Sequence, residues 1–137
     1  MPSFSSTSEE KLDTCHPDLV RLFREVIKTR DCTILDGHRG AEEQNEAFRK
    51  GYSRLAFPHS KHNSVPSMAI DVAPYFECEP HIRWNDSESF YNFIGYVQRV
   101  ADELGVKIRS GADWDMDYDF HDQTFFDLPH FELVADE

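Results

Sequence analysis

The sequence contains no CxxC pair, no excess of positive charge and no long apolar run. Its three cysteines, Cys15, Cys32 and Cys78, disfavour both a disulfide framework and a cysteine zinc site, so reduced thiols are expected. No apolar stretch approaches the roughly 20 residues that a membrane-spanning helix requires. Membrane insertion is therefore not expected.

Positive charge is scarce. Fourteen Lys and Arg stand against 26 Asp and Glu, which gives a formal net charge of −12. Proteins that bind nucleic acids depend on a positive surface, so a nucleic-acid partner is not expected. The first residues, MPSFSSTSEEKLD, also lack the basic region and the apolar run of a secretory signal, so a cytoplasmic protein is expected.

The remaining composition is typical of one folded domain. The chain has 137 residues, of which 39% are hydrophobic and eleven are Phe, enough to bury a core. Helical spacing predicts helices over residues 16–29, 40–50 and 86–104, the last ended by Gly105. Short β-rich runs predict strands over residues 32–35, 68–73, 106–109 and 130–134. The sum is an α+β fold, a small, mostly antiparallel sheet with packed helices.

Two segments lack a periodic pattern. Residues 52–65 are expected to form a loop, and the polar residues 1–13 are a candidate flexible end.

His62, Asp71 and His130 form a candidate metal site. Two histidines and a carboxylate that leave one position open for water are what a catalytic zinc needs. Alternation along residues 68–73 places Asp71 opposite the larger apolar side chains, where an unpaired charge is costly. The alternative is that Asp71 and His130 simply pair with each other.

Five short motifs carry a family resemblance. SxH at residues 60–62, AxD at 69–71 and DxxHxE at 127–132 resemble the M15 family of zinc D,D- and L,D-peptidases, in particular its phage endolysins that cleave the L-alanyl–D-glutamate bond of peptidoglycan. GHRGAEEQ at 37–44 and GADWD at 111–115 are also similar to segments found there. The resemblance covers residues 15–135. It implies a Hedgehog/D,D-peptidase-like fold, with a single zinc peptidase domain over residues 1–137.

The resemblance assigns roles to the metal site. His62, Asp71 and His130 would bind Zn²⁺, and Asp127 would be the general base that takes a proton from the attacking water. Two departures stand out. His62 and Asp71 are nine residues apart (71 − 62 = 9), whereas the usual family spacing is seven, and many relatives have Glu as the base.

Three further polar residues are candidates for the site. Arg39 would hold the scissile carbonyl oxygen or a substrate carboxylate; the alternative is a surface salt bridge with Glu42 or Glu43. Gln44 would contact the substrate or else lie on a helix surface. Glu132 shares a strand face with His130 and would orient that histidine; the alternative is an exposed acid. His59, His81 and His121 have no motif support and are expected on the surface.

An acidic stretch precedes the last strand. Aspartates at alternate positions resemble the start of a Ca²⁺ loop, namely Asp113, Asp115, Asp117 and Asp119. The glycine and the bidentate glutamate of such a loop are replaced by Tyr118 and Thr124. A solvated acidic loop beside the active site is the favoured interpretation, and regulatory Ca²⁺ is the alternative. Trp114 is expected to pack as an apolar anchor or to line the cleft.

Together these features predict a phage endolysin. Its substrate would be the peptidoglycan stem peptide, and it would act as a monomer. It would accumulate in the host cytoplasm and reach the wall through a holin-type pore. The rival functions are a D-Ala-D-Ala carboxypeptidase or dipeptidase with the same metal site, and a non-catalytic peptidoglycan-binding or virion structural module. A nucleic-acid enzyme is a third rival, which the negative charge disfavours.

Overall fold

The computed structural model describes residues 2–117 and 127–134, which form an antiparallel sheet with helices packed against it. The strands lie in the order β1–β2–β4–β3, and all neighbouring pairs are antiparallel. Their bounds are Cys32–Asp36 for β1, Ala69–Pro74 for β2, Ile108–Ser110 for β3 and His130–Leu133 for β4. The α+β class predicted from the sequence is confirmed.

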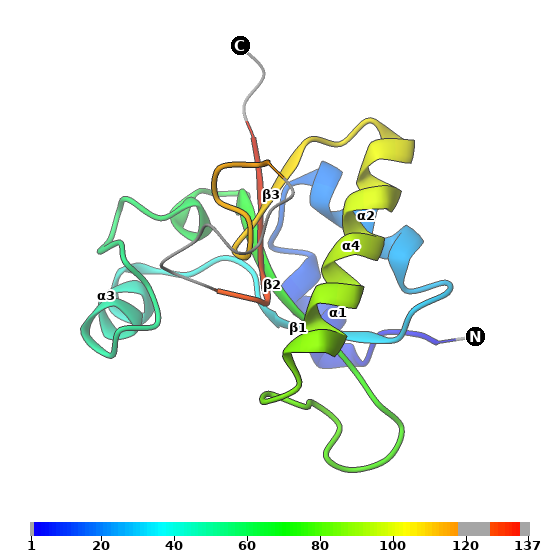
Figure 1. The fold of residues 1–137 in the computed structure, drawn as a ribbon. Helices are drawn as coiled ribbons and strands as arrows, with labels where there is room; N and C mark the ends of the chain where they lie inside the picture. Colours follow the sequence, from blue (N-terminus) through cyan, green and yellow to red (C-terminus); the bar gives the residue numbers. More distant parts are fainter. Residues whose placement is uncertain (1, 118–126, 135–137) are drawn as a thin grey trace.

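The helices lie on two sides of the sheet (Figure 1). Helices α1, α2 and α4 gather on one side, and α3 stands on the other. A short 3-10 helix, η1, lies between α3 and β2 in the chain. The bounds are Ser6–Leu12 for α1, Pro17–Val26 for α2, Ala41–Arg49 for α3, Lys61–Asn63 for η1 and Ser87–Leu104 for α4.

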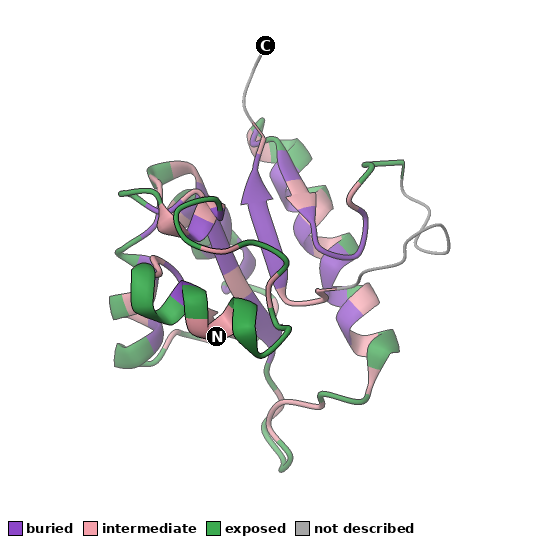
Figure 2. Ribbon diagram, turned by 90° about the vertical axis from the view of Figure 1, so that its left-hand side faces the viewer, coloured by how far each residue is buried: buried purple, intermediate pink, exposed green. Residues whose placement is uncertain are grey.

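The core lies between the sheet and helices α2 and α4. The central strands are buried along their length except at Asp71, which is partly exposed (Figure 2). Both helices present the apolar stripe from which they were predicted, and fully burying such a side chain stabilises the fold by about 1.5–3 kcal/mol. The buried residues of α2 and α4 are Leu19, Leu22, Phe23, Val26, Phe90, Phe93, Ile94, Val97, Val100 and Ala101.

The ends of α4 are set by two residues that satisfy its terminal backbone groups. The Asp86 side chain accepts a hydrogen bond from the amide of Ser89 at 3.2 Å. At the other end Gly105 has a φ of 72°, a left-handed conformation that glycine adopts without steric cost. The predicted stop at Gly105 is therefore confirmed.

Strand β2 separates its side chains onto two faces. Ile70 and Val72 are fully buried in the core, so Asp71 points to the opposite face. Strand β4 pairs with β2 in a register that sets His130 directly opposite Asp71. Residues directly opposite each other in an antiparallel pair share a face of the sheet. The register alone therefore brings these two side chains together.

The N-terminal segment differs from its prediction as a flexible end. Helix α1 forms within it, capped by Ser5, and packs on β1. Leu12 is fully buried, and the hydroxyl of Ser8 accepts a hydrogen bond from the amide of Ile34 at 3.0 Å. A seven-residue helix with one large buried residue gives little periodic signal, because tertiary contacts stabilise it rather than its own sequence.

The three cysteines are free thiols, with Cys15 and Cys32 buried and Cys78 exposed. Burial raises the pKa of Cys15 to about 11 and that of Cys32 to about 12, which keeps both protonated. Among residues 2–117 and 127–134, no helix has the length and apolar character needed to cross a membrane.

Leu12 tests whether α1 belongs to the folded unit. We expect Leu12→Ala to lower the free energy of unfolding by about 2–5 kcal/mol, because it leaves a cavity between α1 and the sheet. Urea denaturation measures this change. Val65→Ala is the control, since Val65 is 85% exposed and should change stability by less than about 0.5 kcal/mol. Equal midpoints for the two variants would contradict the packing of α1.

Candidate active site

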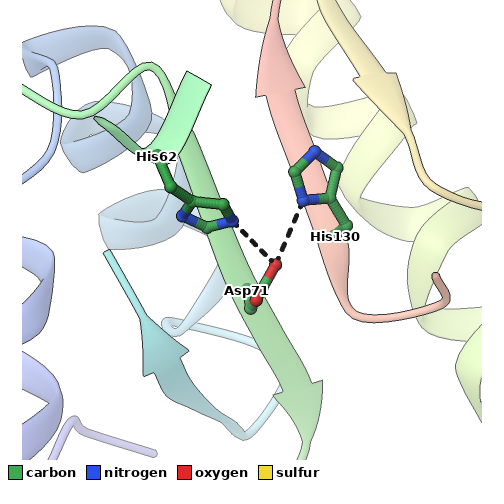
Figure 3. A group of neighbouring side chains, drawn as sticks. All are labelled: His62, Asp71 and His130. Carbon is green, nitrogen blue, oxygen red and sulfur yellow. Dashed lines mark hydrogen bonds and ion pairs between the residues drawn. The ribbon is translucent and has the colours of Figure 1, made fainter. Parts of the chain in front are cut away.

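Three elements bring His62, Asp71 and His130 together on the face of the sheet opposite the core (Figure 3). His62 comes from η1, Asp71 from β2 and His130 from β4. Asp71 Oδ1 lies 3.3 Å from His62 Nε2 and 3.2 Å from His130 Nδ1. One ligand atom from each residue lies within 4.8 Å of the other two, a spacing that a single metal ion can span.

The backbone around η1 aims His62 at Asp71. Ser60 and Asn63 form a capping box that starts η1 inside the segment predicted as a loop. His62 Nδ1 lies 2.7 Å from the carbonyl oxygen of Gly37, which can only accept, so Nδ1 carries the hydrogen. Nε2 is left with its lone pair directed at Asp71. Position 37 needs glycine here, because a Cβ would lie 2.5 Å from the carbonyl oxygen of Lys11.

Glu132 aims His130 in the same way. His130 Nε2 donates to Glu132 Oε1 at 2.8 Å, which leaves Nδ1 for Asp71. The second carboxylate oxygen of Glu132 accepts from Arg109 at 2.7 Å and lies 3.3 Å from Lys61 Nζ. Glu132 thus occupies the orienting position expected from its place on the strand, and it is itself held by two cations.

The donor set fits a metal ion. His62 Nε2 is buried and, among the described residues, has no hydrogen-bond partner, although Asp71 Oδ1 is within ion-pair distance. A neutral imidazole lone pair and a carboxylate oxygen at 3.3 Å are two acceptors facing each other, so a cation or a proton must separate them. Two imidazole nitrogens and one carboxylate suit zinc with an open coordination position. Asp71 and His130 therefore do more than pair with each other, since His62 converges on the same oxygen.

The charges of the cluster shift the pKa values of two of its groups. Burial alone would raise the pKa of Asp71, but the adjacent His62 and the hydrogen bond from His130 outweigh it and lower the pKa. Burial alone would lower the pKa of His130, but hydrogen bonds to Asp71 and Glu132 raise it to about 10. A metal ion must displace the proton that His130 then carries on Nδ1.

Asp127 stands beside the cluster at the turn that enters β4. Its Oδ2 lies 3.9 Å from His130 Nδ1, and its side chain is 28% exposed. Burial, and then the negative charge of Asp71, raise the pKa of Asp127 to about 6, a suitable value for a base near neutral pH. A Cβ at Gly111 would lie 2.0 Å from the carbonyl oxygen of Asp127, so glycine in the GADWD motif permits this turn.

Arg39 lies between two carboxylates of the site. Its Nε donates to Asp36 at 2.8 Å and its Nη2 to Asp71 at 3.1 Å, and its side chain is only 11% exposed. The alternative of a surface salt bridge with Glu42 or Glu43 is wrong, because Arg39 is buried against the sheet. Its location on the cavity wall is compatible with a substrate contact.

Gln44 is placed differently from its prediction as a substrate contact. It is fully buried and is not among the described residues that line the cavity. Its Oε1 accepts from Arg39 at 3.0 Å, and its Nε2 donates to Ser53 Oγ and to the carbonyl oxygen of Leu55. The sequence motif located this residue near the site, but only the structure shows that it acts through Arg39 and the 53–55 backbone.

A cavity of about 740 Å³ opens over the cluster. Asp127 and the two histidines lie on its wall, and Trp114 lines it with its ring centroid 5.4 Å from that of His130. His59, expected on the surface, is exposed but also lines the cavity, and no motif signalled this. His81 stacks on Tyr75 away from the cluster, and His121 lies outside the described residues.

The acidic stretch forms a second carboxylate group. Ligand atoms of Asp113, Asp115 and Asp117 lie within 4.8 Å of one another, with Asp113 buried and the other two exposed. Asp119 lies outside the described residues. Because exposed acidic groups commonly gather without an ion, a Ca²⁺ site here stays a prediction.

The chain is similar to known peptidases over nearly its whole length. The family model for phage L-alanyl-D-glutamate peptidase matches residues 2–134. The L-alanyl-D-glutamate peptidase of Escherichia phage T5 is 35% identical over 136 residues, which cover 96% of this chain and 97% of that protein. The crystal structure of the L-Ala D-Glu endopeptidase ChiX of Serratia marcescens has a TM-score of 0.72 and 27% identity, covering 96% of this chain and 90% of that one.

The raised pKa of His130 makes the stability of the metal-free protein depend on pH. A group whose pKa is raised on folding stabilises the fold fully below its unfolded pKa, about 6.5, and loses that contribution as the pH rises through its folded value, about 10. We therefore expect the free energy of unfolding to fall between about pH 6.5 and 10. Urea denaturation in the presence of a chelator measures it, and His130→Asn should flatten the fall. The same slope in both proteins would contradict the assignment.

Proposed function

The chain belongs to the family of phage L-alanyl-D-glutamate peptidases, and we propose that it is a zinc-dependent endolysin that hydrolyses the L-alanyl–D-glutamate bond of peptidoglycan stem peptides. The observation that carries the proposal is the convergence of His62, Asp71 and His130 beneath a cavity that both histidines and Asp127 line. Two imidazoles, one carboxylate and an adjacent base are the parts that metal-assisted amide hydrolysis requires.

His62, Asp71 and His130 would hold the zinc. An ion bound there would act as a Lewis acid and lower the pKa of a bound water toward about 7. The protein's own contribution is orientation: Gly37 fixes the hydrogen of His62 on Nδ1, and Glu132 fixes that of His130 on Nε2. Each ring therefore presents its other nitrogen to the centre of the cluster.

Asp127 would move the protons of the reaction. As a carboxylate it accepts a proton from the water that attacks the carbonyl carbon of the L-alanyl residue. When the C–N bond breaks, the same proton passes to the amine nitrogen of D-glutamate, and Asp127 is again a carboxylate. A pKa raised to about 6 suits both transfers, because the group then exchanges its proton readily near neutral pH.

Arg39 would stabilise the negative charge that develops on the carbonyl oxygen. Asp36, Gln44 and Asp71 hold its guanidinium in place, so little of its conformational freedom is lost when the substrate binds. Gln44 would be a positioning residue rather than a substrate contact. Release to the wall through a holin-type pore remains part of the proposal, as does the monomeric state.

Metal content tests the centre of the site. We expect purified wild-type protein to contain about one zinc ion per chain by elemental analysis, and His130→Ala to contain none, because one of three protein ligands is lost. His81→Ala is the control, since His81 stacks on Tyr75 outside the cluster and should leave the zinc in place. Equal zinc in all three proteins would place the ion elsewhere.

Digestion of purified muropeptides followed by mass spectrometry tests the reaction. We expect wild type to cleave between L-Ala and D-Glu, and Asp127→Asn to keep its zinc but lose about 10²- to 10⁴-fold in kcat, the usual contribution of a general base. Asp102→Asn, on the exposed face of α4, is the matched control.

Other products would select a rival function. Release of terminal D-Ala without cleavage at L-Ala–D-Glu would identify a carboxypeptidase. A protein that binds zinc and peptidoglycan but cleaves nothing would be a binding module.

A further inference from the structure

The two histidines of the metal cluster come from elements that are stabilised very differently. His130 lies on β4, which pairs with β2 on one side and with β3 on the other. His62 lies on η1, a 3-10 helix of three residues, and so short a helix has little stability of its own. The separation of the two rings, 5.2 Å between centroids, therefore depends on how η1 is tied to the rest of the molecule.

One side of η1 is tied to the segment before α3. The amide of Arg39 donates to the carbonyl oxygen of His62 at 2.8 Å, and the side-chain amide of Asn63 donates to the carbonyl oxygen of Arg39 at 2.9 Å. The His62 ring is itself held by the carbonyl oxygen of Gly37. After η1 the chain gives it little support, since Val65 is exposed. These contacts fix η1 relative to residues 37–39, but not relative to β4.

Lys61 supplies the tie to β4. Its ammonium group donates to the carbonyl oxygen of Leu133 at 2.5 Å and lies 3.3 Å from Glu132 Oε2. In the part of the chain that the structure describes, no other residue of η1 has a hydrogen bond to β4. The backbone brings the two elements within reach, because Met68 donates to the carbonyl oxygen of Lys61 at 3.0 Å and accepts from the amide of Leu133 at 2.9 Å.

We infer that Lys61 is a positioning residue: by tying η1 to the end of β4, it sets the separation of His62 from His130 and raises the affinity of the cluster for its metal ion. The inference rests on the proposed zinc site. A ligand that must be ordered when the ion binds costs conformational entropy, so a ligand ordered beforehand gives tighter binding. Residues that orient metal ligands typically contribute about tenfold to a hundredfold in metal affinity.

Lys61 acts on metal binding in two ways that have opposite signs. Its positive charge repels a bound cation, so a role through charge alone would weaken metal binding. The tie to β4 strengthens metal binding instead. Removal of the ammonium group therefore distinguishes the two roles by the direction of the change in zinc affinity. Glu132 would still orient His130 after this removal, because Arg109 donates to Glu132 at 2.7 Å.

Competition with a chelator of known zinc affinity tests the inference. We expect Lys61→Met to raise the Kd for zinc by about tenfold to a hundredfold, because Met has a similar length but donates no hydrogen bond. Lys107→Met is the matched control: it removes the same charge from an exposed side chain that is not among the described residues of the cavity wall, and it should leave the Kd nearly unchanged.

The fold of the variant is checked by circular dichroism without metal. Lys61→Met should keep the wild-type spectrum, because the Lys61 side chain is 36% exposed and lies outside the core. If Lys61→Met does not fold, Lys61→Gln takes its place with the same expected loss of zinc affinity. At saturating zinc, kcat and KM should return close to the wild-type values, because the ligands are then held by the ion.

The outcomes separate the inference from the proposed function. If wild type binds no zinc, the proposed zinc site fails and the inference fails with it. If wild type binds zinc, equal or tighter binding by Lys61→Met, or an equal loss in Lys107→Met, overturns the inference alone. A raised KM with an unchanged Kd for zinc would also overturn it and would identify Lys61, which lines the cavity, as a substrate contact.

Discussion

The pairing of β2 with β4 is the constraint on which the site depends. It sets Asp71 opposite His130 on the face that the core does not use, and a shift of one residue would turn both side chains to the other face. The same two strands bury Ile70 and Phe131 in the core. Apolar burial therefore fixes the register, and the register fixes the distance between two candidate metal ligands.

A second constraint is electrostatic. Three acidic groups lie close to His130 in a largely buried region, where an unpaired charge is costly: Asp71, Asp127 and Glu132. Arg39 and the protonated His130 balance Asp71, and Arg109 with Lys61 balances Glu132. At Asp127, burial and the negative charge of Asp71 outweigh the nearby positive groups, so its pKa rises. The pKa values of Asp71 and Glu132 fall. The group left with the raised pKa is the one suited to exchange protons.

The sheet and three of the helices could be predicted from local signals in the sequence, and the clustering of His62, Asp71 and His130 could be predicted with the help of the family motifs. Alternation along β2 indicated that Asp71 faces away from the core, and Gly105 indicated the end of α4. The spacing of two residues indicated that Glu132 lies on the same strand face as His130. Helix α1 and η1 escaped prediction because tertiary contacts, not periodicity, stabilise them. Gln44 was located near the site by its motif, yet its partners lie nine to eleven residues further along the chain, in a segment without pattern.

The charges on the cavity wall bear on how a protein with a net charge of −12 can bind an anionic wall polymer. At physiological ionic strength the Debye length is about 8 Å, so surface acids far from the cleft are screened from a bound peptide. Groups on the cavity wall are not screened in this way. Among the described residues of that wall, four carry a cationic side chain and three an acidic one. Net charge governs the approach of the whole molecule, whereas a cation on the cavity wall, such as Arg39, would act on the substrate once it is in the cleft. Recognition and overall acidity are therefore compatible, because they operate over different distances.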